Sequence, residues 1–203
     1  MTDGTPSSGT RERKRRETHR RIAETGLRLF LENGYDATTL DAIAIATGIS
    51  RRTFFYYFQS KEDVLLAYEG GGFGEALGPA LREQPTGQSP IAAAHACFLL
   101  LADRYEREDS ILADRLLRST ESLRSKKELS FLRLEQTLLE AMIERWPEAD
   151  PAILRLDSMI AIGALRLSIE HWRTADGKTS LAMCINHSFK LMDAQFRKGI
   201  GPR

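Results

Sequence analysis

One face of a short predicted helix combines positive charge with aromatic rings: Arg51, Arg52, Phe55 and Tyr56. Phe54 and Phe58 are four residues apart, so they share the opposite face, which can enter a core. A pair of exposed arginines suits the major groove of DNA, where arginine pairs with guanine and aromatic rings pack on thymine methyl groups or on sugars. The alternative is a helical hairpin that happens to be basic.

Two short predicted helices, joined by a tight turn, position this face. The first covers residues 40–46, the turn covers 47–49, and the second covers 50–58. This arrangement is a helix-turn-helix. Apolar residues of both helices and of a preceding long helix can share one core: Phe30, Ile43, Ile49, Phe54 and Phe58.

Capping residues stand where these two helices should begin and end. Thr38 or Thr39 can cap the first helix, and Asp41 lies in its first turn, where a carboxylate offsets unpaired amide groups. Gly48 follows the first helix in the manner of a terminating glycine, and Ser50 can cap the second.

A dense basic stretch precedes the long helix. Residues 11–21 contain seven basic and two acidic side chains, whereas the whole chain of 203 residues has a formal net charge of only +1. Such a block is the electrostatic footprint of a polyanion-binding protein. The alternative is a solvated helix start or an unstructured tail.

Helical periodicity dominates the sequence, which predicts an all-α protein without a sheet. Besides the two short helices and one that starts at Ser60, the predicted helices are 13–32, 91–107, 111–123, 127–146, 152–173 and 179–197. Four glycines between Gly70 and Gly74 indicate a break, which is either a hinge or a plain loop, and 85–90 is a loop. The expected organisation is a disordered tail (1–10), a DNA-binding domain (11–60), a helical ligand-binding and dimerisation domain (61–198) and a flexible tail (199–203).

Several classes of protein find no support in the sequence. The most apolar segment, 91–102, is too short to span a membrane, and no secretory signal is visible, so we expect a cytoplasmic protein. Cys97 and Cys184 are far apart, which indicates neither a disulfide framework nor a zinc site. Nucleophile-elbow, zinc-protease and phosphate-loop motifs are absent, so we expect no enzyme, cofactor or metal.

The segment from about residue 15 to 66 resembles the tetracycline-repressor (TetR) family. The resemblance lies in residues 37–44, in Gly48-Ile49-Ser50, and in residues 53–62, which read TFFYYFQSKE. The upstream segment 22–35, with Leu29-Phe30 and Asn33-Gly34-Tyr35, is similar to the first helix of that family. Beyond this segment, only length, all-helical character and the order of the helices agree.

The resemblance implies roles for individual residues. Thr39 and Lys61 would contact phosphates from the starts of their helices, and Tyr57 would lie near the DNA backbone. Phe55 departs from the family, which usually has a tyrosine there that reaches a phosphate. The full set of expected DNA-binding residues is Thr39, Ser50, Arg51, Arg52, Thr53, Phe55, Tyr56, Tyr57 and Lys61.

The resemblance also implies a homodimer held together by the last two helices. Two apolar stripes could form that interface or could face the core of a single protomer. The first stripe is Leu156, Ile160, Gly163, Ala164 and Leu167. The second stripe is Leu181, Ile185, Phe189 and Met192.

The resemblance further implies a binding site for a small lipophilic effector between residues 73 and 172. Candidate lining residues, which could equally be plain core, are Phe98, Leu101, Tyr105, Leu117, Phe131, Leu138, Met142 and Trp172. His95 and His171 could add polar contacts. Four arginines could meet an acidic ligand or form a solvated face: Arg115, Arg118, Arg124 and Arg133.

The resemblance implies a repressor that leaves a palindromic DNA operator when a small molecule binds. Two other classes stay open at this point. One is a DNA-binding or architectural protein without a ligand, and the other is a small helical enzyme. The sequence names neither the effector nor the operator.

Overall fold

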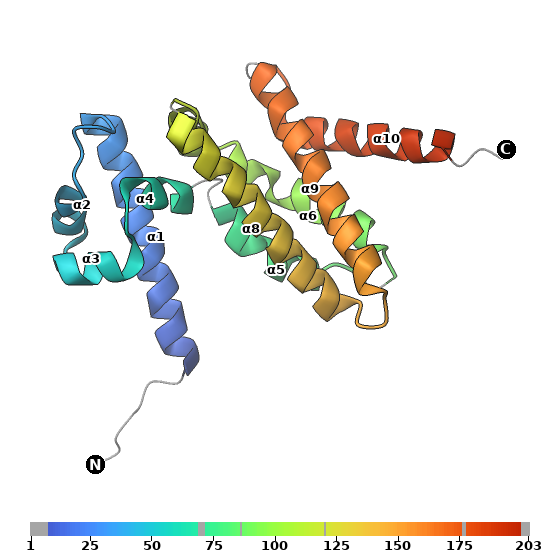
Figure 1. Ribbon diagram of the computed structural model, residues 1–203, viewed down its shortest axis with the longest axis horizontal. Helices are drawn as coiled ribbons and strands as arrows, with labels where there is room; N and C mark the ends of the chain where they lie inside the picture. The colour runs from blue at the N-terminus through green and yellow to red at the C-terminus, as the bar shows by residue number, and fades with distance from the viewer. Residues whose placement is uncertain (1–7, 69–71, 86, 120, 176–177, 200–203) are drawn as a thin grey trace, which may run out of the picture. The chain divides into compact units, whose positions relative to one another are not determined.

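The computed structural model describes residues 8–68, 72–85, 87–119, 121–175 and 178–199 (Figure 1). Helices are the only regular elements within these ranges, as the periodicity predicted. Their bounds are α1 (Ser8–Asn33), α2 (Leu40–Thr47), α3 (Arg51–Tyr57), α4 (Lys61–Tyr68), α5 (Phe73–Arg82), α6 (Pro90–Tyr105), α7 (Glu108–Leu117), α8 (Glu121–Arg145), α9 (Pro151–Thr174) and α10 (Leu181–Gly199). None of the described helices is long and apolar enough to cross a membrane.

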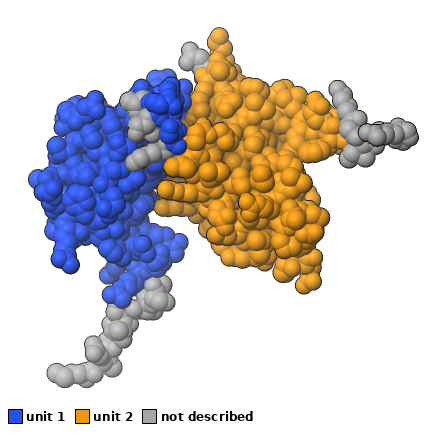
Figure 2. All heavy atoms as spheres, in the orientation of Figure 1, with its two compact units in different colours: residues 1–69, 112–126 blue, residues 70–111, 127–203 orange. Residues whose placement is uncertain are grey.

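The chain folds into two compact units (Figure 2). The first contains residues 1–69 and 112–126, and the second contains residues 70–111 and 127–203. The chain therefore passes between the units after residues 69, 111 and 126. The first unit is larger than the 11–60 segment expected for a DNA-binding domain, because α4 and residues 112–126 also pack within it.

The core of the first unit depends on a close approach between α1 and α4. Ile22, Leu27 and Phe30 recur on one face of α1 and are buried, and Val64 of α4 is buried against them. Gly26 makes this approach possible, since a Cβ atom added there would lie 2.3 Å from the Cγ1 atom of Val64. The five core residues expected from the sequence lie in this cluster, with Ile49 half-buried at its edge.

The caps of α2 and α3 confirm the predicted helix-turn-helix. The Thr39 hydroxyl accepts a hydrogen bond from the Ala42 amide, so Thr39, and not Thr38, caps α2. Gly48 ends α2 with a φ of 70°, in the left-handed region that favours glycine. The Ser50 hydroxyl accepts a hydrogen bond from the Thr53 amide and caps α3.

The second unit is a bundle in which α6, α9 and α10 pack on one another, with α5 against α6. Its core is aromatic and aliphatic, and α8 contributes Phe131, Leu138 and Met142 to it. Arg82 of α5 forms an ion pair with Glu144 of α8, at 2.8 Å between Nε and Oε2, which connects these two helices.

Two expected boundaries differ from the structure, and a third prediction falls partly outside the described residues. Residues 8–10, expected in a disordered tail, form the first turn of α1, while residues 1–7 lie outside the described part of the chain. The expected helices 111–123 and 127–146 are instead α7 and α8. Their break lies near Ser119, whose hydroxyl and amide both donate to the Leu116 carbonyl oxygen, and α7 ends at Leu117, six residues before the expected end. Gly70 and Gly71, the proposed hinge, lie outside the described residues; Gly72 precedes α5 with a φ of 82°.

Candidate functional site

The short helix α3 separates a buried face from an exposed one. Phe54 is fully buried, whereas 69% of Tyr56 is exposed, and Arg51, Arg52 and Thr53 are exposed as well. Because α3 has only seven residues, its position depends on the buried phenylalanine and on the cap at Ser50. The exposed face therefore presents two guanidinium groups and one phenol from a fixed backbone.

Arg51 has contacts within the unit that orient its side chain. Its Nε atom lies 3.2 Å from Oδ1 of Asp41, and its guanidinium carbon lies 5.6 Å from the centroid of the Phe55 ring. Asp41 thus joins α2 to α3 in addition to its place in the first turn of α2. This ion pair is solvent-exposed, so it contributes little to stability, but it limits the directions in which the guanidinium can point.

Phe55 and Tyr57 are half-buried and pack against the core of the first unit. Only part of each ring is therefore accessible to solvent, and the Phe55 ring packs against the Arg51 guanidinium. Of the three consecutive aromatic residues from 55 to 57, Tyr56 is the exposed one.

Lys61, expected to contact a phosphate, is held by the loop that follows α1. Its ammonium group donates to the carbonyl oxygens of Tyr35 at 2.7 Å and of Asp36 at 3.2 Å, and it lies 4.6 Å from the Tyr35 ring centroid. An ammonium group has three protons, so two carbonyl acceptors leave room for one more. Burial, followed by the negative charge of Glu62, raises the pKa of Tyr35 above its ordinary value.

The N-terminal half of α1 carries the basic stretch as a helix with an exposed surface. Arg15 and His19, four residues apart, face the aromatic residues that surround α3. The Arg15 guanidinium lies 5.8 Å from the Tyr56 ring centroid, and the His19 ring stacks on Phe58 at 4.5 Å. His19 was not among the residues predicted from the sequence to bind DNA, although its spacing from Arg15 and Ile22 could have placed it on this face.

Most residues expected to line a ligand site share the core of the second unit. These are Phe98, Leu101, Tyr105, Phe131, Leu138, Met142 and Trp172. Leu117 is the exception, and its inclusion was wrong: it packs in the core of the first unit, with residues of α1 to α4. The periodicity of α7 revealed an apolar face but did not indicate which core that face enters.

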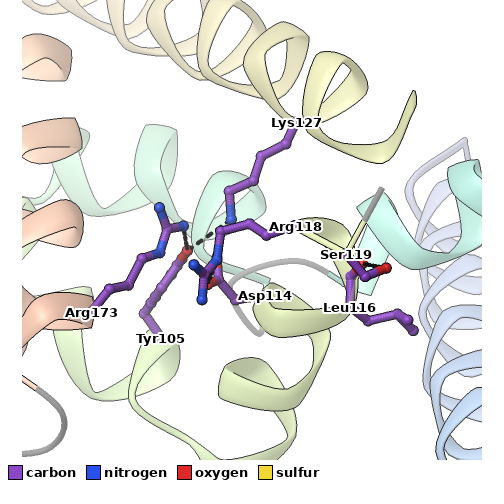
Figure 3. Close-up of polar contacts among 7 residues, drawn as sticks. All are labelled: Tyr105, Asp114, Leu116, Arg118, Ser119, Lys127 and Arg173. Carbon is purple, nitrogen blue, oxygen red and sulfur yellow. Dashed lines mark hydrogen bonds and ion pairs between the residues drawn. The ribbon is translucent and has the colours of Figure 1, made fainter. Parts of the chain in front are cut away.

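Within this apolar core, the Tyr105 hydroxyl forms polar contacts with basic side chains (Figure 3). Its oxygen atom accepts hydrogen bonds from the ammonium of Lys127 and from Nη2 of Arg173, each at 3.3 Å. Two of the four expected arginines form ion pairs with carboxylates. Arg118 pairs with Asp114 at 3.0 Å, and Arg124 pairs with Glu121.

The two expected histidines occupy different surroundings. His95 stacks on Phe189 at 4.2 Å between ring centroids, and burial lowers the pKa of its imidazole despite a hydrogen bond with Asn186. His171 is exposed, and its ring centroid lies 6.0 Å from that of His187 on α10.

The two stripes expected at a dimer interface differ in their exposure to solvent. On α9, Leu156, Gly163 and Leu167 are exposed, Ile160 is half-buried, and Ala164 is buried.

On α10 the expectation was wrong, because Leu181, Ile185 and Phe189 are buried in the core of their own protomer and Met192 packs against it. The exposed apolar side chains of α10 are Met183, Leu191 and Phe196.

No cluster of three or more metal-ligating side chains occurs among the described residues. Both cysteines are buried as free thiols, and burial raises the pKa of Cys97 to about 11. A thiol with so high a pKa is a poor nucleophile at neutral pH, since the thiolate is the reactive form.

The capped α2–turn–α3 arrangement places the protein among helix-turn-helix proteins. Residues 22–68 match the model of the family described as bacterial regulatory proteins, tetR family. Over these residues the chain is therefore similar to the TetR family.

Known regulators resemble the chain over different lengths. The transcriptional regulator TcmR of Streptomyces glaucescens is 38% identical over 104 residues, which are 51% of this chain and 46% of TcmR, so the match spans less than half of that relative. The biofilm operon icaADBC negative regulator IcaR of Staphylococcus epidermidis is 26% identical over 152 residues, or 75% of this chain and 80% of IcaR.

Among solved structures, the TetR-family repressor FadR of Thermus thermophilus, in complex with lauroyl-CoA, superposes with a TM-score of 0.58 at 26% identity. The superposition covers 91% of this chain and 96% of FadR. The resemblance to FadR therefore extends through both units, whereas the family model matches only residues 22–68 of the first.

Proposed function

We propose that the protein is a transcriptional repressor that binds a palindromic DNA operator as a homodimer and leaves it when a small molecule occupies the second unit. The observation that carries this proposal is the exposed face of α3, where Arg51, Arg52 and Tyr56 project from a helix fixed by a buried phenylalanine and a serine cap. In the major groove the guanidinium groups would pair with guanine edges. A protein that binds chromosomal DNA would act in the cytoplasm. We propose no enzymatic activity.

The helix starts of the first unit would position the protein on the DNA backbone. Thr39 and Ser50 cap α2 and α3, and both are exposed at helix N-termini, which attract phosphates. Arg15, close to Tyr56, would add a phosphate contact beside the groove.

The exposed faces of α9 and α10 would form the dimer interface. These helices pack side by side, and their solvent-facing apolar side chains include Ile153, Leu156, Met159, Leu167, Met183 and Leu191. Apolar groups that lie together on a surface are typical of a partner site. A two-fold axis there would give each dimer two copies of α3, which a palindromic operator requires.

The effector would be a molecule with a large apolar part, since the candidate lining residues are aromatic and aliphatic. The lauroyl-CoA bound to the similar FadR of Thermus thermophilus supports a ligand of this kind. A ligand that binds better to the conformation unsuited to DNA would shift the population away from the operator. The second candidate function, DNA binding without a ligand, would follow if no compound changed DNA affinity.

A fluorescence anisotropy titration tests DNA recognition. DNA from upstream of the protein's own gene is compared with a scrambled duplex at two salt concentrations. We expect preference for the upstream DNA, and we expect Arg51→Ala/Arg52→Ala to remove most of it. One bidentate arginine–guanine pair contributes about 1–3 kcal/mol of discrimination.

Arg28→Ala is the matched control. It also removes an exposed arginine with a carboxylate partner, Glu32, but on α1, away from α3. Preference for upstream DNA that survives in the double variant would contradict recognition through α3.

A further inference from the structure

A single acidic side chain belongs to the helix-turn-helix, and it is paired with an arginine of the exposed α3 face. Asp41 is the only aspartate or glutamate between residues 37 and 60. It lies in the first turn of α2, whereas Arg51 begins α3, so their ion pair of 3.2 Å crosses the turn between the helices. A carboxylate on a surface that faces DNA repels phosphates, and this cost indicates a role beyond the start of α2.

The contact determines which edge of the Arg51 guanidinium is left for a partner outside the unit. A guanidinium has five N–H donors in a fixed, planar fork. Asp41 engages Nε, and the Phe55 ring centroid lies 5.6 Å from the guanidinium carbon. These two contacts leave the edge formed by Nη1 and Nη2, and 70% of the Arg51 side chain is exposed.

Guanine is the base that this edge fits. In the major groove guanine presents two adjacent acceptors, O6 and N7, whereas adenine presents one acceptor and one donor. Two parallel N–H groups therefore match guanine and not adenine. An arginine that is already held in one direction also loses less conformational freedom when it binds.

We infer that Asp41 is a positioning residue, which holds Arg51 so that it reads one guanine in each operator half-site. This inference rests on the proposed function, and it adds the base that is read and the residue that orients its reader. Asp41 would then affect DNA binding in two opposite directions. It lowers affinity for any DNA through its charge, and it raises discrimination between sequences through Arg51.

Asp41→Asn, which removes the charge at nearly constant size, tests both directions. Anisotropy titrations compare a duplex that the parent protein selects from a random pool with a scrambled duplex. We expect the variant to bind the scrambled duplex at least as tightly as the parent does. Its preference for the selected duplex should fall about three- to tenfold, since an immobilised side chain of this type contributes about that much.

A matched variant controls for the loss of charge alone. Asp36→Asn removes another exposed carboxylate of the first unit, from the loop before α2, and should leave the preference for the selected duplex unchanged. Should Asp41→Asn lack a cooperative thermal transition, Asp41→Ser, which keeps a polar group in the first turn of α2, takes its place.

Two neighbouring arginines separate positioning from a structural role in α2. In the Arg51→Ala background, Asp41→Asn should no longer change the preference. In the Arg52→Ala background, it should lower the preference by the same factor as in the parent. A role confined to the start of α2 would instead act equally in both backgrounds.

A modified base identifies what Arg51 reads. Guanines of the selected duplex are replaced one at a time by 7-deazaguanine, which lacks the N7 acceptor. At one position in each half-site this change should weaken the parent about tenfold and leave the affinity of Arg51→Ala unchanged. Inosine, which keeps O6 and N7, is the control and should bind the parent like guanine.

The inference is overturned if Asp41→Asn keeps the full preference, if the loss persists in Arg51→Ala, or if no guanine depends on Arg51. A parent protein that selects no duplex would contradict the proposed function, and this inference with it. A parent that selects a duplex, together with unchanged preference in Asp41→Asn, would contradict this inference alone.

Discussion

At the scale of single residues, the first unit depends on a position where only a hydrogen atom fits. Gly26 of α1 faces Val64 of α4, and a Cβ atom there would lie 2.3 Å from a methyl carbon that is fully buried. Val64 is β-branched and stiff, so it cannot rotate aside without a shift of one helix. Replacing glycine with alanine usually stabilises a helix, but here the steric overlap with Val64 makes the substitution destabilising.

We therefore expect Gly26→Ala to lower the free energy of unfolding by about 1–3 kcal/mol, the usual range for an overpacked core. Urea denaturation followed by circular dichroism measures the change. Gly74→Ala in α5 is the control, because its Cβ would lie 3.6 Å from Leu134 Cδ1, an ordinary contact, and the variant should be neutral or slightly more stable. A Gly26→Ala protein as stable as the parent would mean that α1 and α4 are less closely packed in solution.

At the scale of secondary structure, the N-terminal half of α1 has charge but hardly any core contact. From residue 10 on, where burial is described, the first fully buried residue of the helix is Ile22, and residues 11–17 are all exposed. Intrahelical ion pairs such as Arg16–Glu12 and Arg20–Glu24 support this half only weakly. A basic helix of this kind gains stability when phosphates lie along it.

Replacing Arg13, Lys14 and Arg15 with glutamine should weaken binding to upstream and scrambled DNA by similar factors, because phosphate contacts carry no sequence information. The slope of log K against log salt should become shallower by about 0.9 for every phosphate that the variant no longer neutralises. Anisotropy titrations at four salt concentrations measure the slope. An unchanged slope would show that this half of α1 does not touch DNA.

At the scale of the whole molecule, an operator with two half-sites requires two copies of α3, and the exposed apolar face of α9 offers a means of pairing. Leu156→Asp places a charge where 55% of the leucine surface is exposed in the protomer. If that surface is buried in a dimer, an unpaired carboxylate there is costly, and the dimer should dissociate. Sedimentation velocity measures the change in mass.

The same variant should lose affinity for the palindromic DNA without losing its fold. Leu129→Asp is the control, since Leu129 of α8 is 52% exposed and receives the same change in chemistry outside the proposed interface. A Leu156→Asp protein that sediments like the parent would place the dimer interface elsewhere.

Local signals were sufficient to find the helix-turn-helix. Thr39 and Ser50 cap helices through bonds that span three residues, and Gly48 ends α2 through its own backbone conformation. The four-residue spacing of Phe54 and Phe58 likewise fixes one buried face of α3. Such features depend on neighbours in sequence, so the sequence by itself determined this motif and the all-helical fold.

Tertiary packing decided what lies beyond the reach of a few residues. Helix α10 has apolar residues on two faces, and only its packing against α6 and α9 determined that Phe189 is buried while Leu191 is exposed. Leu117 and Phe98 both lie on apolar faces of predicted helices, yet they enter different cores. The meeting of Tyr105, Lys127 and Arg173 joins positions up to 68 residues apart, because three helices bring them together, and no periodicity contains that information.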